Sequence, residues 1–266
     1  MIKPMYLMLT LFTLPVFASS LPIFDTHLHY QSDSRYEPKE VIELINQSGV
    51  KYALVSSNSN DPTFELYDLA PNVIVPSLRP YRQKNELRSW MYDTSLITYL
   101  KAELNKRNYV ALGEFHAFGD EVDTPVSQDM IALAKQHNLI LHHHGDSEAV
   151  IRLFSQWPDA RILWAHAGFA DLDQIDDMLT QYPNLWADLS HRDDITTWAG
   201  FNPIWEPILI KHADRFTLGA DTYNDERWGK LPLYMLDSRD WLRALSDEVA
   251  QKIAFRNAQS LFLNSR

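Results

Sequence analysis

Short apolar runs recur along the chain and alternate with longer segments of helical spacing. Eight of these runs have the composition of β-strands, and most are continuously apolar rather than alternating. This pattern is typical of parallel strands that are covered on both faces. The predicted strands are residues 23–29, 52–57, 73–78, 109–114, 139–144, 162–166, 185–189 and 216–221.

The segments between these runs repeat apolar residues at intervals of three and four, as in 38–48, where Val41, Leu44 and Ile45 share one face. Eight strand–helix repeats over about 250 residues predict a single α/β domain folded as a (β/α)8 TIM barrel. A doubly wound open sheet has the same local pattern, so closure of the barrel is inferred from the count and the length. The other predicted helices are residues 87–106, 127–137, 147–157, 171–181, 203–212 and 239–254, with the weakest helical pattern at 58–72.

The N-terminal eighteen residues have a different character. Lys3 is their only charge, residues 5–17 are nearly all apolar, and Val16-Phe17-Ala18 resembles a signal-peptidase site. The apolar stretch is too short to span a membrane and contains Pro15. We therefore expect residues 1–18 to be a secretory signal peptide and residues 19–266 to form the barrel. The expected product is secreted, with the periplasm as its compartment and no stable membrane association after cleavage.

The net charge and the absence of cysteine limit the kinds of partner and covalent modification to be expected. The formal net charge is −11, which opposes non-specific binding to nucleic acid because such binding needs clustered lysine and arginine. The chain has no cysteine, so neither a disulfide nor a lipid-modified cysteine is expected. A small molecule is the expected substrate.

Polar residues of the kinds that bind metals stand at the C-terminal tips of several predicted strands. In a barrel these tips converge on one rim, where active sites of this fold are built. Side chains alternate along a strand, so His27 and His29 point the same way and could share one divalent ion. The segments concerned are Asp25-Thr-His27-Leu-His29, Gly113-Glu114-Phe115-His116, His142-His143-His144, Ala165-His166-Ala167-Gly168 and Ala220-Asp221-Thr222.

Each of these residues also has a structural interpretation. Glu114 could be a rim charge, Asp221 could have a structural role, and His166 could be a core histidine with its hydrogen bonds satisfied. Glu114 and Asp221 directly follow apolar runs, however, where an unpaired carboxylate is costly. In the triple histidine, alternation turns either His142 and His144 or His143 alone toward the barrel axis. We favour His144 as the ligand because it lies nearest the tip.

Taken together, the motifs resemble those of the amidohydrolase superfamily, in particular its amidohydrolase-2 and TatD-type branches. The resemblance extends over essentially the whole mature chain and includes the closing helix. It rests on DTHLH at 25–29, GEF at 113–115, the histidines at 142–144, WAHAG at 164–168, GADT at 219–222 and RNAQSLF at 256–262.

The resemblance implies a metal centre. His27, His29 and Asp221 would hold one ion, and Glu114 would bridge to a second ion held with His144 and His166. In relatives with one ion, the histidine at the position of His166 is not a ligand but polarises the substrate or carries a proton, so one or two ions remain open. Histidine and carboxylate ligands suit Zn²⁺ first, with Mn²⁺ or another divalent ion as alternatives. Asp221 would accept a proton from the attacking water and pass it to the leaving group.

The implied activity is hydrolysis of an ester, lactone, amide or phosphoester bond in a small molecule. Arg79 after strand three and Arg192 after strand seven are candidates for binding a carboxylate or phosphate, although each could instead form a structural ion pair. Two alternatives remain: non-oxidative decarboxylation by the same kind of centre, and a secreted metal-binding protein without turnover. Possible walls of the substrate site are Tyr81, His116 and Trp228.

Overall fold

The structure of the protein is a computed structural model that describes residues 21–264. The predicted signal peptide at residues 1–18 lies outside the described residues. Within residues 21–264, none of the helices combines the length and the apolar character needed to cross a bilayer.

Eight parallel strands form a closed ring, which confirms the TIM barrel and excludes the open sheet. The strands β1 to β7 pair in chain order, and β7 pairs with β10. Beyond β10, Asp25 of β1 bridges to Leu218 and closes the ring. The barrel strands are β1 (Ile23–His29), β2 (Val50–Ser56), β3 (Ile74–Leu78), β4 (Ala111–His116), β5 (Ile140–His144), β6 (Ile162–Trp164), β7 (Leu185–Asp188) and β10 (Phe216–Thr217).

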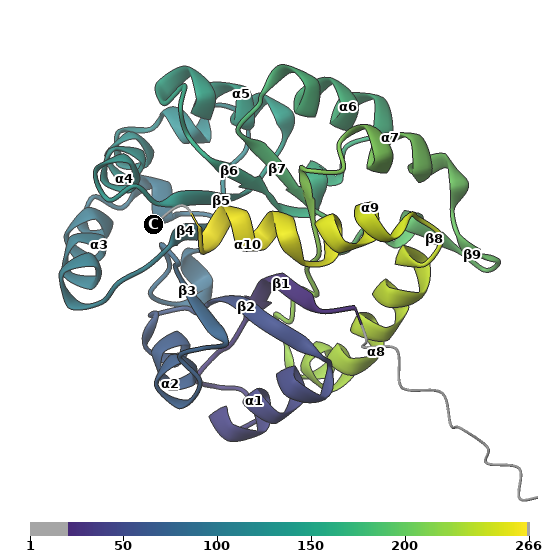
Figure 1. Ribbon diagram of the computed structural model, residues 1–266. Helices are drawn as coiled ribbons and strands as arrows, with labels where there is room; N and C mark the ends of the chain where they lie inside the picture. Colours follow the sequence, from purple (N-terminus) through teal and green to yellow (C-terminus); the bar gives the residue numbers. More distant parts are fainter. Residues whose placement is uncertain (1–20, 265–266) are drawn as a thin grey trace, which may run out of the picture.

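Helices surround the ring (Figure 1), and several begin at capping residues that the sequence supplies. The side chains of Thr124, Asp146 and Asp171 accept hydrogen bonds from the first turns of α4, α5 and α6. A hairpin of β8 (Thr196–Thr197) and β9 (Gly200–Phe201) projects from the side of the barrel near α8. The helices are α1 (Pro38–Gln47), α2 (Asp61–Leu69), α3 (Ser95–Lys106), α4 (Pro125–Gln136), α5 (Ser147–Gln156), α6 (Leu172–Gln181), α7 (Glu206–Lys211), α8 (Asp225–Leu242), α9 (Asp247–Gln251) and α10 (Asn257–Phe262).

Two predicted helices differ most from the structure. The helix predicted at 87–106 begins only at Ser95, whose backbone N–H donates to the Asp93 carboxylate. The helix predicted at 239–254 is divided, because α8 ends at Leu242 and Ser246 caps a new helix, α9. The first part of α8 was not predicted, since it contains Pro232, a residue that usually ends a helix.

The inside of the barrel is filled at its N-terminal end by one apolar layer. Figure 1 shows α10 lying across this end of the barrel. Its residue Phe262 is 1% exposed and packs against Phe24, with the ring centroids 5.7 Å apart. The closed end is therefore apolar, and the polar residues are left to the opposite end. The layer consists of Phe24, Leu54, Val75, Ala111, Ile140 and Leu163 from six strands and Ala258, Leu261 and Phe262 from α10.

Truncating this plug should destabilise the whole barrel. We expect Phe262→Ala to lower the free energy of unfolding by about 3–5 kcal/mol, because it removes buried surface and leaves a cavity. Leu236→Ala on α8, where the leucine is 51% exposed, should change it by about 0.5 kcal/mol or less. Urea denaturation followed by circular dichroism measures both, and equal effects of the two substitutions would contradict the role given to α10.

Candidate metal centre

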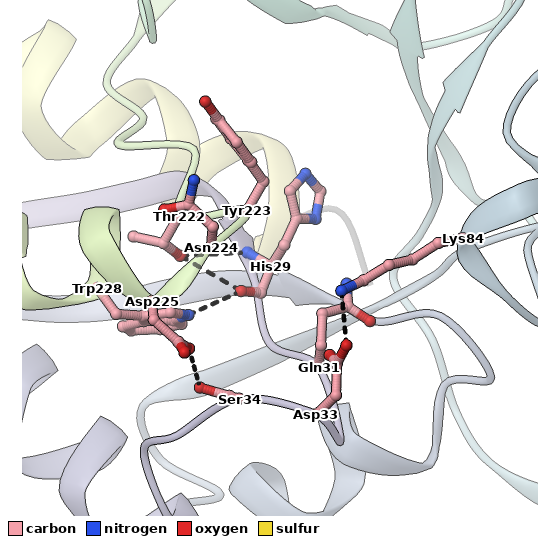
Figure 2. Close-up of a pocket in the computed structure, with 10 residues that line it drawn as sticks. All are labelled: His29, Gln31, Asp33, Ser34, Lys84, Thr222, Tyr223, Asn224, Asp225 and Trp228. Carbon is pink, nitrogen blue, oxygen red and sulfur yellow. Dashed lines mark hydrogen bonds and ion pairs between the residues drawn. The ribbon is translucent and has the colours of Figure 1, made fainter.

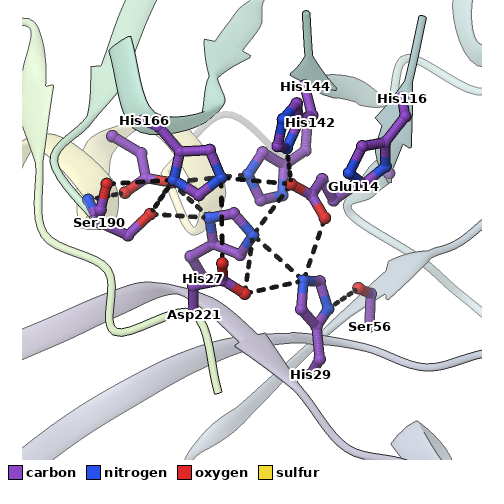
Figure 3. Close-up of polar contacts among 12 residues, drawn as sticks. His27, His29, Ser56, Glu114, His116, His142, His144, His166, Ser190 and Asp221 are labelled. Carbon is purple, nitrogen blue, oxygen red and sulfur yellow. Dashed lines mark hydrogen bonds and ion pairs between the residues drawn. The ribbon is translucent and has the colours of Figure 1, made fainter. Parts of the chain in front are cut away.

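A cavity lies at the carboxyl end of β1, between the segments that follow β1, β3 and β10 (Figure 2), and the predicted metal ligands gather beside it (Figure 3). The cavity has a volume of about 190 Å³ and shares His29 with the ligand cluster. Lys84 on its wall is paired with Asp33 at 2.8 Å. The other lining residues are Gln31, Ser34, Thr222, Tyr223, Asn224, Asp225 and Trp228.

Four of the predicted ligands converge at the tips of β1, β4 and the segment after β10. The Nε2 atoms of His27 and His29 lie 3.1 Å apart. Glu114 Oε1 lies 3.4 Å from the first of these nitrogens, and Oε2 lies 3.2 Å from the second. Asp221 Oδ1 lies 3.7 and 3.4 Å from the same two nitrogens. Ligand atoms about 2.1 Å from a tetrahedral zinc ion stand about 3.4 Å from one another. His27, His29 and Glu114 can therefore supply ligand atoms to one ion, and Asp221 Oδ1 lies at a similar distance from both histidine nitrogens.

The hydrogen bonding of the cluster supports this fit. Asp221 Oδ1 is buried and has no hydrogen-bond partner, although such an atom normally has one. Burial lowers the pKa of His27, yet the carboxylates of Asp221, Glu114 and Asp188 outweigh it and raise that pKa well above its usual value. Burial and then Arg79 lower the pKa of His29 to about 4, so its imidazole is neutral, the form that binds metals. The cluster therefore carries an excess of negative charge that a cation would balance.

A second group shares Glu114 with the first. Glu114 Oε1 lies 2.7 Å from His144 Nδ1 and 3.6 Å from His166 Nε2, and the three residues can supply ligand atoms to one ion. The Nε2 atom of His166 also lies 3.9 Å from Asp221 Oδ2. The structure thus brings all six predicted ligands together, in an arrangement that can hold one ion or two.

The three consecutive histidines of β5 have different surroundings. His144 faces Glu114 and stacks on His116, with the ring centroids 4.0 Å apart. His143 is fully buried, and its Nε2 lies 2.9 Å from the carbonyl oxygen of Ala117. His142 lies deeper, with its ring centroid 4.5 Å from that of His27 and its Nε2 without a hydrogen-bond partner. The positions favour His144 over His142 as the ligand from this strand.

Asp188 and Ser190, which the sequence analysis missed, orient two of these histidines. The Nδ1–H of His27 donates to Asp188 Oδ2 at 2.6 Å. Ser190 Oγ lies 3.1 Å from that nitrogen and 2.8 Å from Nδ1 of His166. Burial opposes ionisation of Asp188, but the neighbouring His27 outweighs it and holds the pKa of this carboxyl well below its usual range. Such partners fix the ring orientation and tautomer of a ligating histidine, so the Nε2 atoms face the cluster.

His191 is a further residue that the sequence analysis missed. Its Nε2 lies 3.0 Å from Asp221 Oδ2, and its side chain is 24% exposed at the mouth. The backbones of His191 and Asp221 both have positive φ, +56° and +48°. Non-glycine residues adopt such angles rarely, and they concentrate at functional sites. Sequence signals existed for these residues, because Asp188 lies near the C-terminal tip of the predicted strand 185–189, and Ser190 and His191 follow that strand.

The two candidate arginines are both engaged by other groups. Arg79 lies inside the cluster, where Nη2 donates to Glu114 Oε2 at 3.0 Å and Nη1 lies 3.2 Å from His29 Nδ1. Arg192 donates to both carboxylate oxygens of Asp194 at 2.9 Å and to the carbonyl of Ala170 at 2.7 Å. A structural role accounts for these contacts of Arg192, and its binding of substrate stays a prediction.

The three predicted wall residues also have defined partners. The backbone N–H of His116 donates to the hydroxyl of Tyr81 at 2.6 Å, and Trp228 Nε1 donates to the carbonyl of His29 at 3.0 Å. Tyr81 and Trp228 are both buried, and Trp228 lines the cavity of Figure 2. These two side chains therefore hold the backbone at the tips of β4 and β1 in place.

Comparisons with known proteins identify the family and agree with the fold. The family model described as amidohydrolase matches residues 106–263, more than half of the chain. A TIM-barrel protein of uncharacterised function from Bordetella bronchiseptica superposes with a TM-score of 0.64 at 13% identity, covering 91% of this chain and 98% of that one. A candidate 2-pyrone-4,6-dicarboxylic acid hydrolase from Pseudomonas putida gives 0.59 at 14% identity, covering 91% and 97%. A β-aspartyl dipeptidase from Fervidobacterium islandicum gives 0.57 at 13% identity, covering 90% and 72%. No curated protein sequence matches the chain significantly.

Removing the charge of Asp188 should weaken metal binding without removing a predicted ligand. We expect Asp188→Asn to lower the affinity for Zn²⁺ by about 10- to 100-fold, because the ring of His27 loses the acceptor that orients it. Competition with a chromogenic chelator measures this affinity. Asp177→Asn, the same change at an exposed position on α6, is the matched control. An unchanged affinity in the Asp188 variant would show that Asp188 does not position His27.

Proposed function

The chain belongs to the amidohydrolase family, and from this premise we propose that it is a metal-dependent hydrolase of a small molecule. The bond cleaved is an ester, lactone, amide or phosphoester. The observation that carries the proposal is the convergence of two histidine nitrogens and two carboxylates. The two nitrogens lie 3.1 Å apart and 3.2–3.7 Å from the carboxylate oxygens, one of which has no hydrogen-bond partner.

In this proposal His27, His29 and Asp221 hold one divalent ion together with Glu114. The group of Glu114, His144 and His166 provides for a second ion. The nitrogen and oxygen donors suit Zn²⁺ first and Mn²⁺ next. When bound, such an ion lowers the pKa of water and polarises the oxygen of a carbonyl or phosphoryl group.

The residues of the chain then supply the proton transfer. Asp221 has one oxygen, Oδ1, toward His27 and His29 and the other, Oδ2, toward His191 and His166. We assign to this carboxylate the acceptance of a proton from the attacking water and its delivery to the leaving group. His191 holds the carboxylate in place. In the arrangement with a single ion, His166 is not a ligand and instead polarises the substrate or carries a proton.

The contacts of the arginines favour hydrolysis over the alternative of decarboxylation. Decarboxylation of a bound acid needs a cation available for the substrate carboxylate. Arg79 is paired with Glu114 at 3.0 Å, and Arg192 with Asp194 at 2.9 Å. The second alternative, a metal-binding protein without activity, differs from a hydrolase in that it would bind the ion but not turn over any substrate.

The proposal is tested by metal-dependent turnover. The chain is stripped with a chelator, reloaded with Zn²⁺ or Mn²⁺, and assayed against chromogenic esters, lactones, amides and phosphoesters, with evolved CO₂ measured on carboxylate substrates. We expect hydrolysis that is lost on chelation and restored by the ion, and little of it in the His27→Ala/His29→Ala control, which lacks two ligands. Bound metal without turnover on any substrate would support the binding protein instead.

A single substitution tests the role of the proton acceptor. We expect Asp221→Asn to lower kcat by about 10²- to 10⁴-fold, the usual contribution of general acid–base catalysis, because the amide cannot accept the proton. The amide oxygen can still face the ion, so most of the bound metal should remain. Steady-state kinetics and elemental analysis of the same sample measure both quantities. Activity close to that of the unmodified chain would remove Asp221 from proton transfer.

A further inference from the structure

Three exposed aromatic side chains border the candidate metal centre. Phe118, Phe169 and Tyr223, here named the aromatic rim, are 48%, 58% and 52% exposed. Phe169 stacks on His166, with the ring centroids 4.6 Å apart and the planes at 24°. The centroid of Phe118 lies 6.0 Å from that of His144. The aromatic rim therefore rests directly on residues of the site while it keeps free ring surface.

Tyr223 connects the aromatic rim to the cavity. Its ring centroid lies 6.0 Å from that of His191, and it also lines the cavity beside His29 (Figure 2). A ligand in the cavity would thus meet the metal centre on one side and aromatic surface on another. Phe118 and Phe169 do not line this cavity but lie against His144 and His166 of the metal centre. Exposed aromatic residues beside a candidate site are a common mark of ligand binding.

The backbone that presents Phe169 is strained. His166, Ala167, Gly168 and Phe169 have consecutive φ values of +58°, +49°, +63° and +52°, a left-handed turn. Only glycine adopts such angles freely, and a Cβ on Gly168 would lie 1.9 Å from the Trp164 ring. Phenylalanine at the last position gains little from burial, because it stays more than half exposed. Strain kept at such a position points to function rather than to packing.

The charges that line the cavity beside Tyr223 are unfavourable for an anionic substrate. The guanidinium of Arg79 is paired with Glu114 and the ammonium of Lys84 with Asp33. Among the residues that line the cavity, Asp33 and Asp225 outnumber the one cation, Lys84. A carboxylate on the substrate would have to break one of these ion pairs or remain beside an acidic wall.

We propose that the aromatic rim binds an uncharged planar ring of the substrate, stacked against Phe169, with the scissile carbonyl at the metal centre. This inference rests on the proposed function and names its substrate class, a neutral aryl ester or unsaturated lactone. Because flat rings stack on aromatic faces, the aromatic rim selects for ring-bearing substrates over alkyl ones.

The binding test uses hydroxamic acids, which chelate divalent ions and differ here only in the attached group. Acetohydroxamic, benzohydroxamic and 4-carboxybenzohydroxamic acids are titrated into the zinc-loaded full chain by isothermal calorimetry. We expect the phenyl compound to bind roughly three- to ten-fold more tightly than the methyl compound, the usual contribution of one aromatic stack. The added carboxylate should weaken binding by roughly three-fold or more, because it faces like charges.

Variants of Phe169 assign the effect to the aromatic rim. Phe169→Asn keeps a residue that tolerates the left-handed backbone, so loss of the ring is separated from loss of the fold. It should remove the preference for the phenyl compound, and Phe169→Tyr should keep it. Trp198→Ala is the matched control, because this fully exposed tryptophan lies between β8 and β9 and contacts no proposed ligand of the ion.

The outcomes distinguish this inference from the proposed function. Equal affinities for the methyl and phenyl compounds, or an unchanged preference in Phe169→Asn, would overturn the aromatic rim and leave the metal centre intact. Tighter binding of the carboxylated compound would overturn the selection for uncharged substrates. If none of the three acids binds the zinc-loaded chain, the metal centre itself is wrong, and this inference is lost with it.

Discussion

The site depends on one backbone contact, the closure of the barrel between its first and last strands. The backbone N–H of Thr26 donates to the carbonyl of Leu218 at 2.8 Å, and the N–H of Asp221 donates to the carbonyl of His27 at 2.6 Å. These bonds join segments that lie almost two hundred residues apart in the chain. Because they fix the last segment against β1, the Asp221 carboxylate meets the two imidazoles of that strand. An open sheet with the same sequence would leave these ligands at opposite edges.

Closure also concentrates charge where water is largely excluded. Glu114, Asp188 and Asp221 are buried around His27, and buried carboxylates are tolerated only when they are paired or bind cations. Arg79 and His27 balance part of this charge in the structure. The electrostatics and the geometry of the mouth are therefore both compatible with a cation in the cluster. The apolar layer at the N-terminal end of the barrel contributes the stability that holds these buried charges in place.

Much of this architecture can be predicted from the sequence, because buried parallel strands leave continuous apolar runs and their tips carry the polar residues. All six predicted ligands come together for that reason. Asp188 and His191 were not predicted, since their importance depends on which ring nitrogen or carboxylate oxygen they face, and that is decided by side-chain rotation. The inward position of Arg79 was missed for the same reason. The first part of α8 could not be predicted, because it contains Pro232. Tertiary packing there stabilises the helix against the tendency of proline to end it.

The plug formed by α10 has a consequence for the order of folding. The layer inside the barrel begins with Phe24 and ends with Phe262, so its first and last members come from the two ends of the domain. β1 likewise needs the segment after β10, which is made late in synthesis, to complete its hydrogen bonds. A chain still emerging from the ribosome therefore lacks the pieces that seal its interior. The barrel can close only after both ends of the domain have been synthesised.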